Sequence, residues 1–140
     1  MSGRAWVFVG AGVVAVAVLL FRPRASSPGA ERLARAIAKA EGFGVPGALP
    51  TRANNPGDLK LGGNTISGIT VFETVADGWR ALYAQIDKMT SGLSAFYSNG
   101  TTIRQMGQKW TATASQQLAW SKTVADALGV DIDTPIGDIV

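Results

Sequence analysis

Glu41 is the residue whose position in this sequence most directly indicates chemistry. It ends an amphipathic segment, residues 30–41, and Gly42 follows it. Leu33, Ile37 and Glu41 are spaced by four residues, so they share one face of a predicted helix. Burial on that apolar face, at the negative end of a helix, would raise the pKa of the carboxyl. A carboxyl that stays protonated near neutral pH can act as a general acid in glycoside cleavage. The alternative is a frayed helix end at which Glu41 faces water.

A turn rich in amide side chains follows about a dozen residues later. Asn54 and Asn55 tolerate left-handed backbone conformations, Pro56 fixes φ, and Gly57 accepts a positive φ. The two amides also offer donors and acceptors that suit sugar hydroxyls and N-acetyl groups. Taken alone, this motif indicates only a turn.

Three segments taken together resemble a known family. They are AEGFG at 40–44, ANNPGDLK at 53–60 and VFETVADGWRAL at 71–82. In this combination they are similar to the lysozyme-like lytic transglycosylase and muramidase domains of bacteriophages and bacterial mobile elements. The resemblance covers roughly residues 30–140. The Ser after the glutamate and the Gly-Leu-Met-Gln segment of better-known bacterial transglycosylases are absent, so the similarity is to the phage-type branch.

The resemblance implies a function and a set of site residues. Glu41 would be the single catalytic acid, and Asn54, Asn55, Gly57 and Asp58 would belong to the substrate-binding turn. Glu41 would protonate the oxygen between N-acetylmuramic acid and N-acetylglucosamine, then act as base on the C6 hydroxyl and yield a 1,6-anhydro product. The peptidoglycan glycan strand is the expected partner, and no metal or cofactor is implied. Two alternatives stay open: a hydrolytic muramidase, and a non-catalytic virion or envelope structural protein that binds glycan and contacts other proteins of that particle.

The sequence does not require a second catalytic carboxylate. Glycosidases commonly use two, about 5 Å apart in retaining enzymes and farther apart in inverting ones. Asp77 is expected to cap a helix, and Glu73 is expected to face solvent. Asp58 occupies a turn position at which members of the resembled family often have Asn. A mechanism with Glu41 alone is therefore favoured.

Composition excludes several classes of enzyme. The chain of 140 residues contains no His and no Cys. A zinc enzyme with His ligands, a Cys-His peptidase and a Ser-His-Asp hydrolase are therefore excluded. The net charge of +3 comes from the first 24 residues, because residues 25–140 carry ten basic and ten acidic side chains. That balance offers no argument for binding nucleic acid.

An uncharged, apolar stretch at residues 5–21 predicts a single transmembrane helix. A helix of that length spans about 26 Å, which is at the short end for a hydrocarbon core of about 30 Å. Arg4, Arg22 and Arg24 flank the stretch and can reach the headgroups. A cleaved signal peptide is the rival interpretation, but Arg22, Pro23 and Arg24 stand where its small-residue cleavage site would lie. We expect a membrane anchor over residues 1–24 and a linker over residues 25–29. The setting would be a virion internal membrane or the bacterial inner membrane, with the domain facing the wall.

The elements that must position these residues follow from caps and periodicity. The predicted domain, residues 30–140, is α+β: mostly helical, lysozyme-like, with a small β-hairpin beside the cleft. Helices are expected over residues 30–41, 74–89, 102–108 and 114–128, with a hairpin in residues 59–72 that turns at 62–64 and a last turn from residue 134.

Aromatic residues divide into core and cleft candidates. Phe72 and Trp79 are expected in the core, whereas Trp110 and Trp120 are expected near loops or helix surfaces. Aromatic faces stack on sugar rings, so Trp110 and Tyr83 are candidate substrate-binding residues. In the helix at 114–128, the predicted inward face consists of Leu118, Ser121, Val124 and Leu128.

Overall fold

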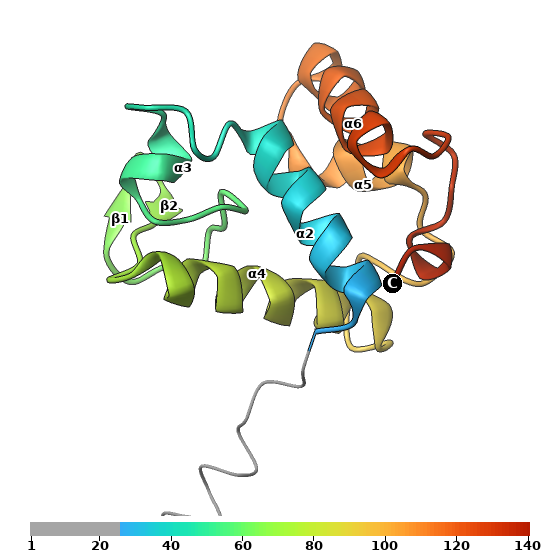
Figure 1. The fold of residues 1–140 in the computed structure, drawn as a ribbon, viewed down its shortest axis with the longest axis horizontal. Coiled ribbons are helices and arrows are strands. Elements are labelled where there is room, and N and C mark those ends of the chain that lie inside the picture. The colour runs from blue at the N-terminus through green and yellow to red at the C-terminus, as the bar shows by residue number, and fades with distance from the viewer. Residues whose placement is uncertain (1–25) are drawn as a thin grey trace, which may run out of the picture.

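The computed structural model describes residues 26–140. This part of the chain is mostly helical and contains one small antiparallel hairpin, so it is α+β as expected (Figure 1). No helix within residues 26–140 is long and apolar enough to cross a membrane. The predicted anchor at residues 5–21 lies outside the described residues.

The elements follow one another with short connections. They are α2 (Pro28–Glu41), α3 (Leu49–Arg52), β1 (Thr65–Ile66), β2 (Ile69–Thr70), α4 (Val75–Thr90), α5 (Ile103–Trp110), α6 (Ala114–Leu128) and a 3-10 turn, η1 (Ile136–Asp138).

Helix α2 has clear signals at both ends, and these fix the position of Glu41. Ser27 is the N-cap, and its hydroxyl accepts a hydrogen bond from the N–H of Ala30. Gly42 ends the helix in the left-handed conformation, at φ 80°, and its N–H reaches the carbonyls of Ala38 and Lys39. Glu41 is therefore the last residue of α2, and the chain turns away directly after it.

The core surrounds α2, which runs between α4 and α6 (Figure 1). Helix α5 packs against α6. The largest buried side chains come from all four long helices and the C-terminal turn: Leu33, Ile37, Leu82, Ile86, Met89, Ile103, Met106, Val124 and Ile136. These contacts hold the end of α2 against the side of α6.

The position of the hairpin turn differs from the prediction. Thr65 pairs with Thr70 and Ile66 with Ile69, so the turn consists of Ser67 and Gly68, not residues 62–64. Both turn residues have positive φ, 49° and 86°. A two-residue turn of this kind matches the right-handed twist of its strands.

Two expectations about burial are also corrected. On α6, Leu118 is 43% exposed whereas Trp120 is only 4% exposed, so the inward face is displaced towards α2. This follows because α6 packs against α2 as well as α5. Trp79 and Phe72 are half-buried and do not belong to the core proper. Trp79 packs edge-on to Phe43, with ring centroids 5.6 Å apart.

Candidate active site

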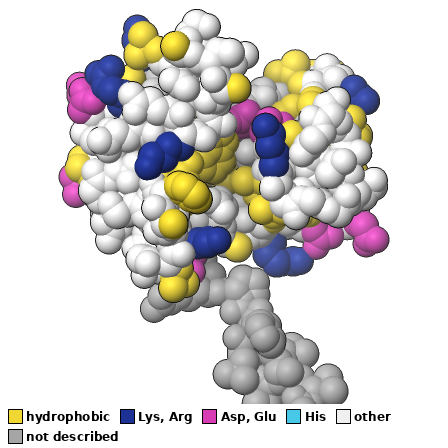
Figure 2. All heavy atoms as spheres, turned by 180° about the vertical axis from the view of Figure 1, so that it is seen from behind, with side chains coloured by type: hydrophobic (Ala, Val, Ile, Leu, Met, Phe, Trp, Pro, Cys, Tyr) yellow, Lys and Arg dark blue, Asp and Glu magenta, His cyan; other side chains and the backbone are white. Residues whose placement is uncertain are grey.

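A hollow of about 420 Å³ lies between α6 and the turn that follows α3. Figure 2 shows it between two lobes of the molecule, with hydrophobic side chains on its floor and charged side chains at its border. The polar and aromatic lining residues come from four places in the chain. Glu41 ends α2, Asp58 and Lys60 follow α3, Trp110 ends α5, and Gln116 and Trp120 lie on α6. Its size is within the range of small-molecule sites.

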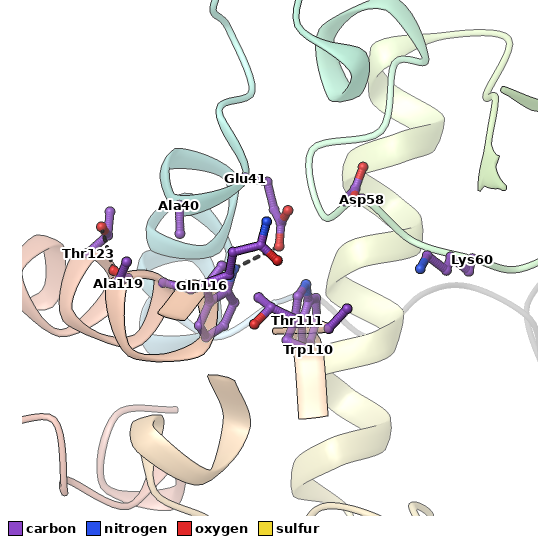
Figure 3. Close-up of a pocket in the computed structure, with 11 residues that line it drawn as sticks. Ala40, Glu41, Asp58, Lys60, Trp110, Thr111, Gln116, Ala119 and Thr123 are labelled. Atoms are coloured by element: carbon purple, nitrogen blue, oxygen red, sulfur yellow. Dashed lines mark hydrogen bonds between the residues drawn. The ribbon is translucent and has the colours of Figure 1, made fainter. Parts of the chain in front are cut away.

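Glu41 projects into this hollow from the end of α2 (Figure 3). The indole Nε1–H of Trp120 donates a hydrogen bond of 2.7 Å to its Oε1 atom. In Figure 3 the side chain of Gln116, one turn earlier on α6, also points towards Glu41. The carboxyl is therefore held from one side by α6 and is not at a frayed helix end.

The surroundings of Glu41 raise its pKa from an ordinary 4.5 to about 7. Burial has the largest effect, because it disfavours the charged form, and the negative charge of Asp58 adds to it. The indole N–H groups of Trp120 and Trp110 and the charge of Lys60 lower the pKa and partly offset the increase. Glu41 is consequently divided between its acid and carboxylate forms near neutral pH.

Two stacked indoles form the inner wall. The rings of Trp110 and Trp120 have centroids 5.6 Å apart and an angle of 24° between their planes. Trp110 donates its Nε1–H to the carbonyl of Gly57 at 3.2 Å. Trp110 thus lines the hollow as predicted for a cleft residue, and it also connects α5 to the turn.

Trp120 was not predicted as a site residue. Its distance from Glu41 along the sequence gave no reason to pair the two. One signal was present, because Trp120, Val124 and Leu128 are spaced by four residues and mark an apolar face.

Asp58 and Lys60 lie across the hollow from α6 (Figure 3). The backbone of Asp58 is left-handed, with φ 52°. Burial raises the pKa of its carboxyl, and Lys60 lowers it. Asp58 is thus in the hollow as predicted, whereas Lys60 is an addition that the sequence did not suggest.

Asn55 has a different role from the predicted one. Its side chain has no exposed surface. The amide nitrogen donates to the carbonyls of Leu59 and Thr70, at 2.9 and 2.8 Å, and the amide oxygen accepts from the N–H of Leu59 at 2.9 Å. Asn55 therefore ties the turn to the hairpin and does not present its amide to a ligand.

Asn54 and Gly57 are also occupied by contacts within the protein. The Asn54 amide donates to the carbonyl of Phe72 at 3.0 Å and contacts that of Glu73 at 3.4 Å. Gly57 is buried, and a Cβ at this position would lie 2.8 Å from Cδ1 of Leu82. Gly57 thus allows the turn to approach α4, and its carbonyl receives Trp110. Both residues shape the wall that carries Asp58.

Tyr83 lies apart from the hollow that contains Glu41. It stacks on Trp79 with centroids 6.1 Å apart, and it lines neither this hollow nor the smaller one beside it. The predicted substrate contact of Tyr83 is thus not part of the site that the structure brings together.

A second hollow, of about 290 Å³, adjoins the first. The two share Asp58, Lys60 and Trp110 as lining residues. Tyr97 and Lys109 form the far wall of the second one. Lys109 donates to the carbonyl of Phe96, and its ammonium lies 5.5 Å from the centre of the Tyr97 ring. A long ligand in the first hollow could therefore continue past Trp110 into the second.

Within residues 26–140, no group of three or more His, Cys, Asp or Glu side chains is placed to hold a metal ion. No protein-family model, no curated protein and no solved structure matches the chain.

Proposed function

We propose that this domain cleaves the glycan strand of peptidoglycan as a lytic transglycosylase, with Glu41 as general acid and then general base. The observation that carries the proposal is a partly buried carboxyl, with its pKa raised to about 7, in an open hollow lined by indole rings. In this proposal the α+β domain is of the lysozyme-like type.

The reaction requires one proton donor that can take a proton back. The protonated Glu41 carboxyl gives its proton to the oxygen between N-acetylmuramic acid and N-acetylglucosamine as the bond from C1 to that oxygen breaks. The resulting carboxylate accepts the proton of the C6 hydroxyl of the same muramic acid while that oxygen bonds to C1. A 1,6-anhydro ring forms, Glu41 returns to its acid form, and no water is consumed. A pKa near the working pH suits both halves of this cycle.

The walls of the two hollows supply complementary chemistry for such a strand. The exposed part of Trp110 can pack against the apolar face of a sugar ring, and Gln116 offers an amide beside Glu41. Lys60 and Lys109 complement the carboxylates of lactyl groups and stem peptides. The second hollow gives a neighbouring sugar a place to bind.

The predicted anchor at residues 5–21 gives the proposed activity a location. It would hold the domain at a membrane of a virion or a bacterium, on the side that faces the wall. Local opening of the wall during genome delivery or lysis fits that arrangement.

One observation favours hydrolysis as a second candidate. Asp58 lies in the same hollow as Glu41 and influences its pKa. Two carboxyl groups are the usual equipment of a hydrolytic muramidase, in which water replaces the C6 hydroxyl as the nucleophile. The mass of the product distinguishes the two reactions, because the anhydro sugar is lighter by one water.

The substitution Glu41→Gln tests the proposal. It removes the proton donor with little change in shape, so clearing of purified peptidoglycan should be lost while the fold is kept. Glu73→Gln is the matched control, since Glu73 is exposed and lines neither hollow, and it should clear at the wild-type rate. Activity retained by Glu41→Gln would contradict the proposal and favour a different catalytic group. Binding without clearing by the wild-type protein would favour the non-catalytic glycan-binding function.

A further inference from the structure

The hydrogen bond between Trp120 and Glu41 constrains more than the position of the carboxyl. An indole Nε1–H is a donor only and has no lone pair to offer. The atom that it contacts, Oε1 of Glu41 at 2.7 Å, must therefore act as an acceptor. In a carboxylic acid the carbonyl oxygen is a better acceptor than the hydroxyl oxygen, so this contact favours Oε1 as the carbonyl oxygen and Oε2 as the protonated one.

We infer that Trp120 is a positioning residue that keeps the acidic proton of Glu41 on Oε2, and so selects the oxygen that transfers the proton. The inference depends on the proposed glycan cleavage for its catalytic meaning. The hydrogen bond and its effect on Glu41 can be measured without any catalysis.

The packing around Trp120 makes it suitable for this role. The side chain is 4% exposed, and its ring stacks on Trp110. Trp110 is itself fixed by its hydrogen bond to Gly57. An indole that is buried and stacked in this way is held in place, so the carboxyl aligns with the indole.

The same contact serves both halves of the proposed reaction. In the acid form, Oε1 is the carbonyl-like oxygen and accepts from Trp120, which leaves the proton on Oε2. After proton transfer, the indole N–H stabilises the new carboxylate through Oε1. Oε2 is then free to take the proton of the C6 hydroxyl. The proton leaves from and returns to one atom, and the carboxyl need not rotate between the steps.

The charged groups that face Glu41 act separately from Trp120. Asp58 raises its pKa and Lys60 lowers it, and both come from the turn on the opposite side of the hollow. Neither lies on α6, so a change at position 120 leaves them in place. Trp110 also lowers the pKa of Glu41 and stacks on Trp120, so the contribution of the Trp120 N–H is isolated by a replacement that keeps the shape of the ring.

The most specific test replaces only the indole N–H of Trp120. Incorporation of 3-benzothienylalanine at position 120 of the full chain exchanges the N–H for sulfur and keeps the shape of the ring system. The chain contains three glutamates, Glu31, Glu41 and Glu73. Labelling glutamate with carbon-13 at the carboxyl therefore gives three signals, and the Glu41→Gln variant assigns the one of interest. The protein would be held in a mild detergent because of its predicted anchor.

We expect the pKa of Glu41 to rise, because a donor that favours the carboxylate has been removed. The alkaline limb of the pH–rate profile should move to higher pH by the same amount. The turnover number should fall by roughly tenfold or more with little change in KM, because the lost contact aligns the acid rather than binding substrate. Trp120→Phe should give the same direction of shift, and Trp79→Phe, outside both hollows, should leave the Glu41 signal unchanged.

The outcomes separate this inference from the proposed function. An unchanged Glu41 pKa in a folded benzothienyl protein overturns the role of Trp120, whatever happens to the rate. A fall in rate with no movement of the alkaline limb also overturns it, since packing alone would then explain the loss. A raised pKa in a protein without glycan-cleaving activity supports the hydrogen-bond inference and contradicts the proposed function instead.

Discussion

At the scale of the residue, the properties of Glu41 result from a balance among a few neighbours. Burial and Asp58 raise its pKa, whereas Trp120, Trp110 and Lys60 lower it, and the result is about 7. An uncompensated buried carboxyl would stay protonated too firmly to donate well, and an exposed one would be ionised at the working pH. In the proposed reaction, these neighbours would suit Glu41 to proton transfer in both directions.

Replacement of Asp58 tests the contribution of its charge. Asp58→Asn keeps the left-handed backbone, which Asn tolerates. It removes a negative neighbour that raises the pKa of Glu41. The pKa of Glu41 should fall, so the acid form is lost at a lower pH and the alkaline limb of the activity profile moves down by up to about one pH unit. Activity near pH 5 should be kept. Loss of activity at every pH in a folded variant would identify Asp58 as a second catalytic carboxylate and favour the hydrolytic muramidase.

The raised pKa of Glu41 also has a consequence for stability. The folded value of about 7 lies above the ordinary value of 4.5, so the folded state binds more protons than the unfolded state between these two pH values. Stability associated with Glu41 is then fully present below about pH 4.5 and is lost as the pH rises towards 7. The glutamine side chain in Glu41→Gln does not titrate, so the variant does not lose stability over this interval. The difference in free energy of unfolding between Glu41→Gln and wild type should therefore grow in favour of the variant as the pH rises, to about 3 kcal/mol at most. Urea unfolding at pH 4.5 and pH 8 measures the difference, and an equal difference at both pH values would contradict the stated pKa.

At the scale of the elements, the turn at residues 53–60 depends on buried amide contacts. Asn55 bonds to three backbone groups, of which the N–H of Leu59 and the carbonyl of Thr70 depend on it most. Thr70 also donates its own N–H to the carbonyl of Leu59. These bonds hold the hairpin against the turn and so place Asp58 and Lys60 opposite α6.

Asn55→Ala should destabilise the domain by about 2–4 kcal/mol, because it leaves buried backbone groups unsatisfied. Chemical unfolding provides the measurement. Asn64→Ala is the control, since Asn64 is exposed and its truncation should change stability by no more than about 0.5 kcal/mol. Similar effects of the two substitutions would show that the buried amide does not hold the turn.

Gly78 permits the close approach of α4 to the same turn. A Cβ at this position would lie 1.8 Å from the carbonyl oxygen of Asn54 and 2.9 Å from Cδ of Pro56. Gly78→Ala should therefore displace the turn and reduce both stability and peptidoglycan clearing, although Ala is the better helix former. At Gly100 the nearest atom, Oγ of Ser98, would be 3.8 Å away, so Gly100→Ala should be neutral in both assays. A Gly78→Ala protein with wild-type stability would contradict the stated contact.

Local sequence signals predict the long helices of this domain but not the position of its hairpin turn. The four long helices were predicted to within a few residues, whereas the short helix α3 was not predicted. The structure shows local signals at the ends of the long helices: the N-caps Ser27, Thr74 and Thr102 and the terminal glycines Gly42 and Gly129. The predicted position of the hairpin turn was wrong, because residues 62–64 and residues 67–68 both contain glycine and both fit a turn. The choice between them depends on contacts of Thr70 with Asn55 and Leu59, which no local pattern reveals.

The site could be predicted only in part for the same reason. Glu41, Asp58 and Trp110 were all named from the sequence and share one hollow in the structure. The partner of Glu41, Trp120, lies 79 residues away and meets it only because α2 packs on α6. The burial of Asn55 likewise depends on the hairpin folding over it.

At the scale of the whole molecule, the site is formed by two sides that α2 joins. One side consists of the turn and hairpin, with Asp58 and Lys60, and the other consists of α5 and α6, with Trp110 and Trp120 (Figure 1). Glu41 lies where these sides meet, at the end of the helix that packs against α4 and α6. Helix α2 begins at Pro28, so the six residues 22–27 between it and the predicted anchor can reach at most about 21 Å. A domain held by that anchor would therefore work close to its membrane.

In the proposed reaction, Glu41 cleaves glycan strands without the addition of water. The most direct test of this reaction is mass spectrometry of the fragments that the full chain releases from purified peptidoglycan, with Glu41→Gln and Glu73→Gln measured in parallel. We predict muropeptides with 1,6-anhydro ends from the wild type and from Glu73→Gln, and none from Glu41→Gln. Anhydro fragments from Glu41→Gln, or no fragments from the wild type, would contradict this reaction. Wild-type fragments heavier by one water would show that the protein is a hydrolytic muramidase and not a lytic transglycosylase.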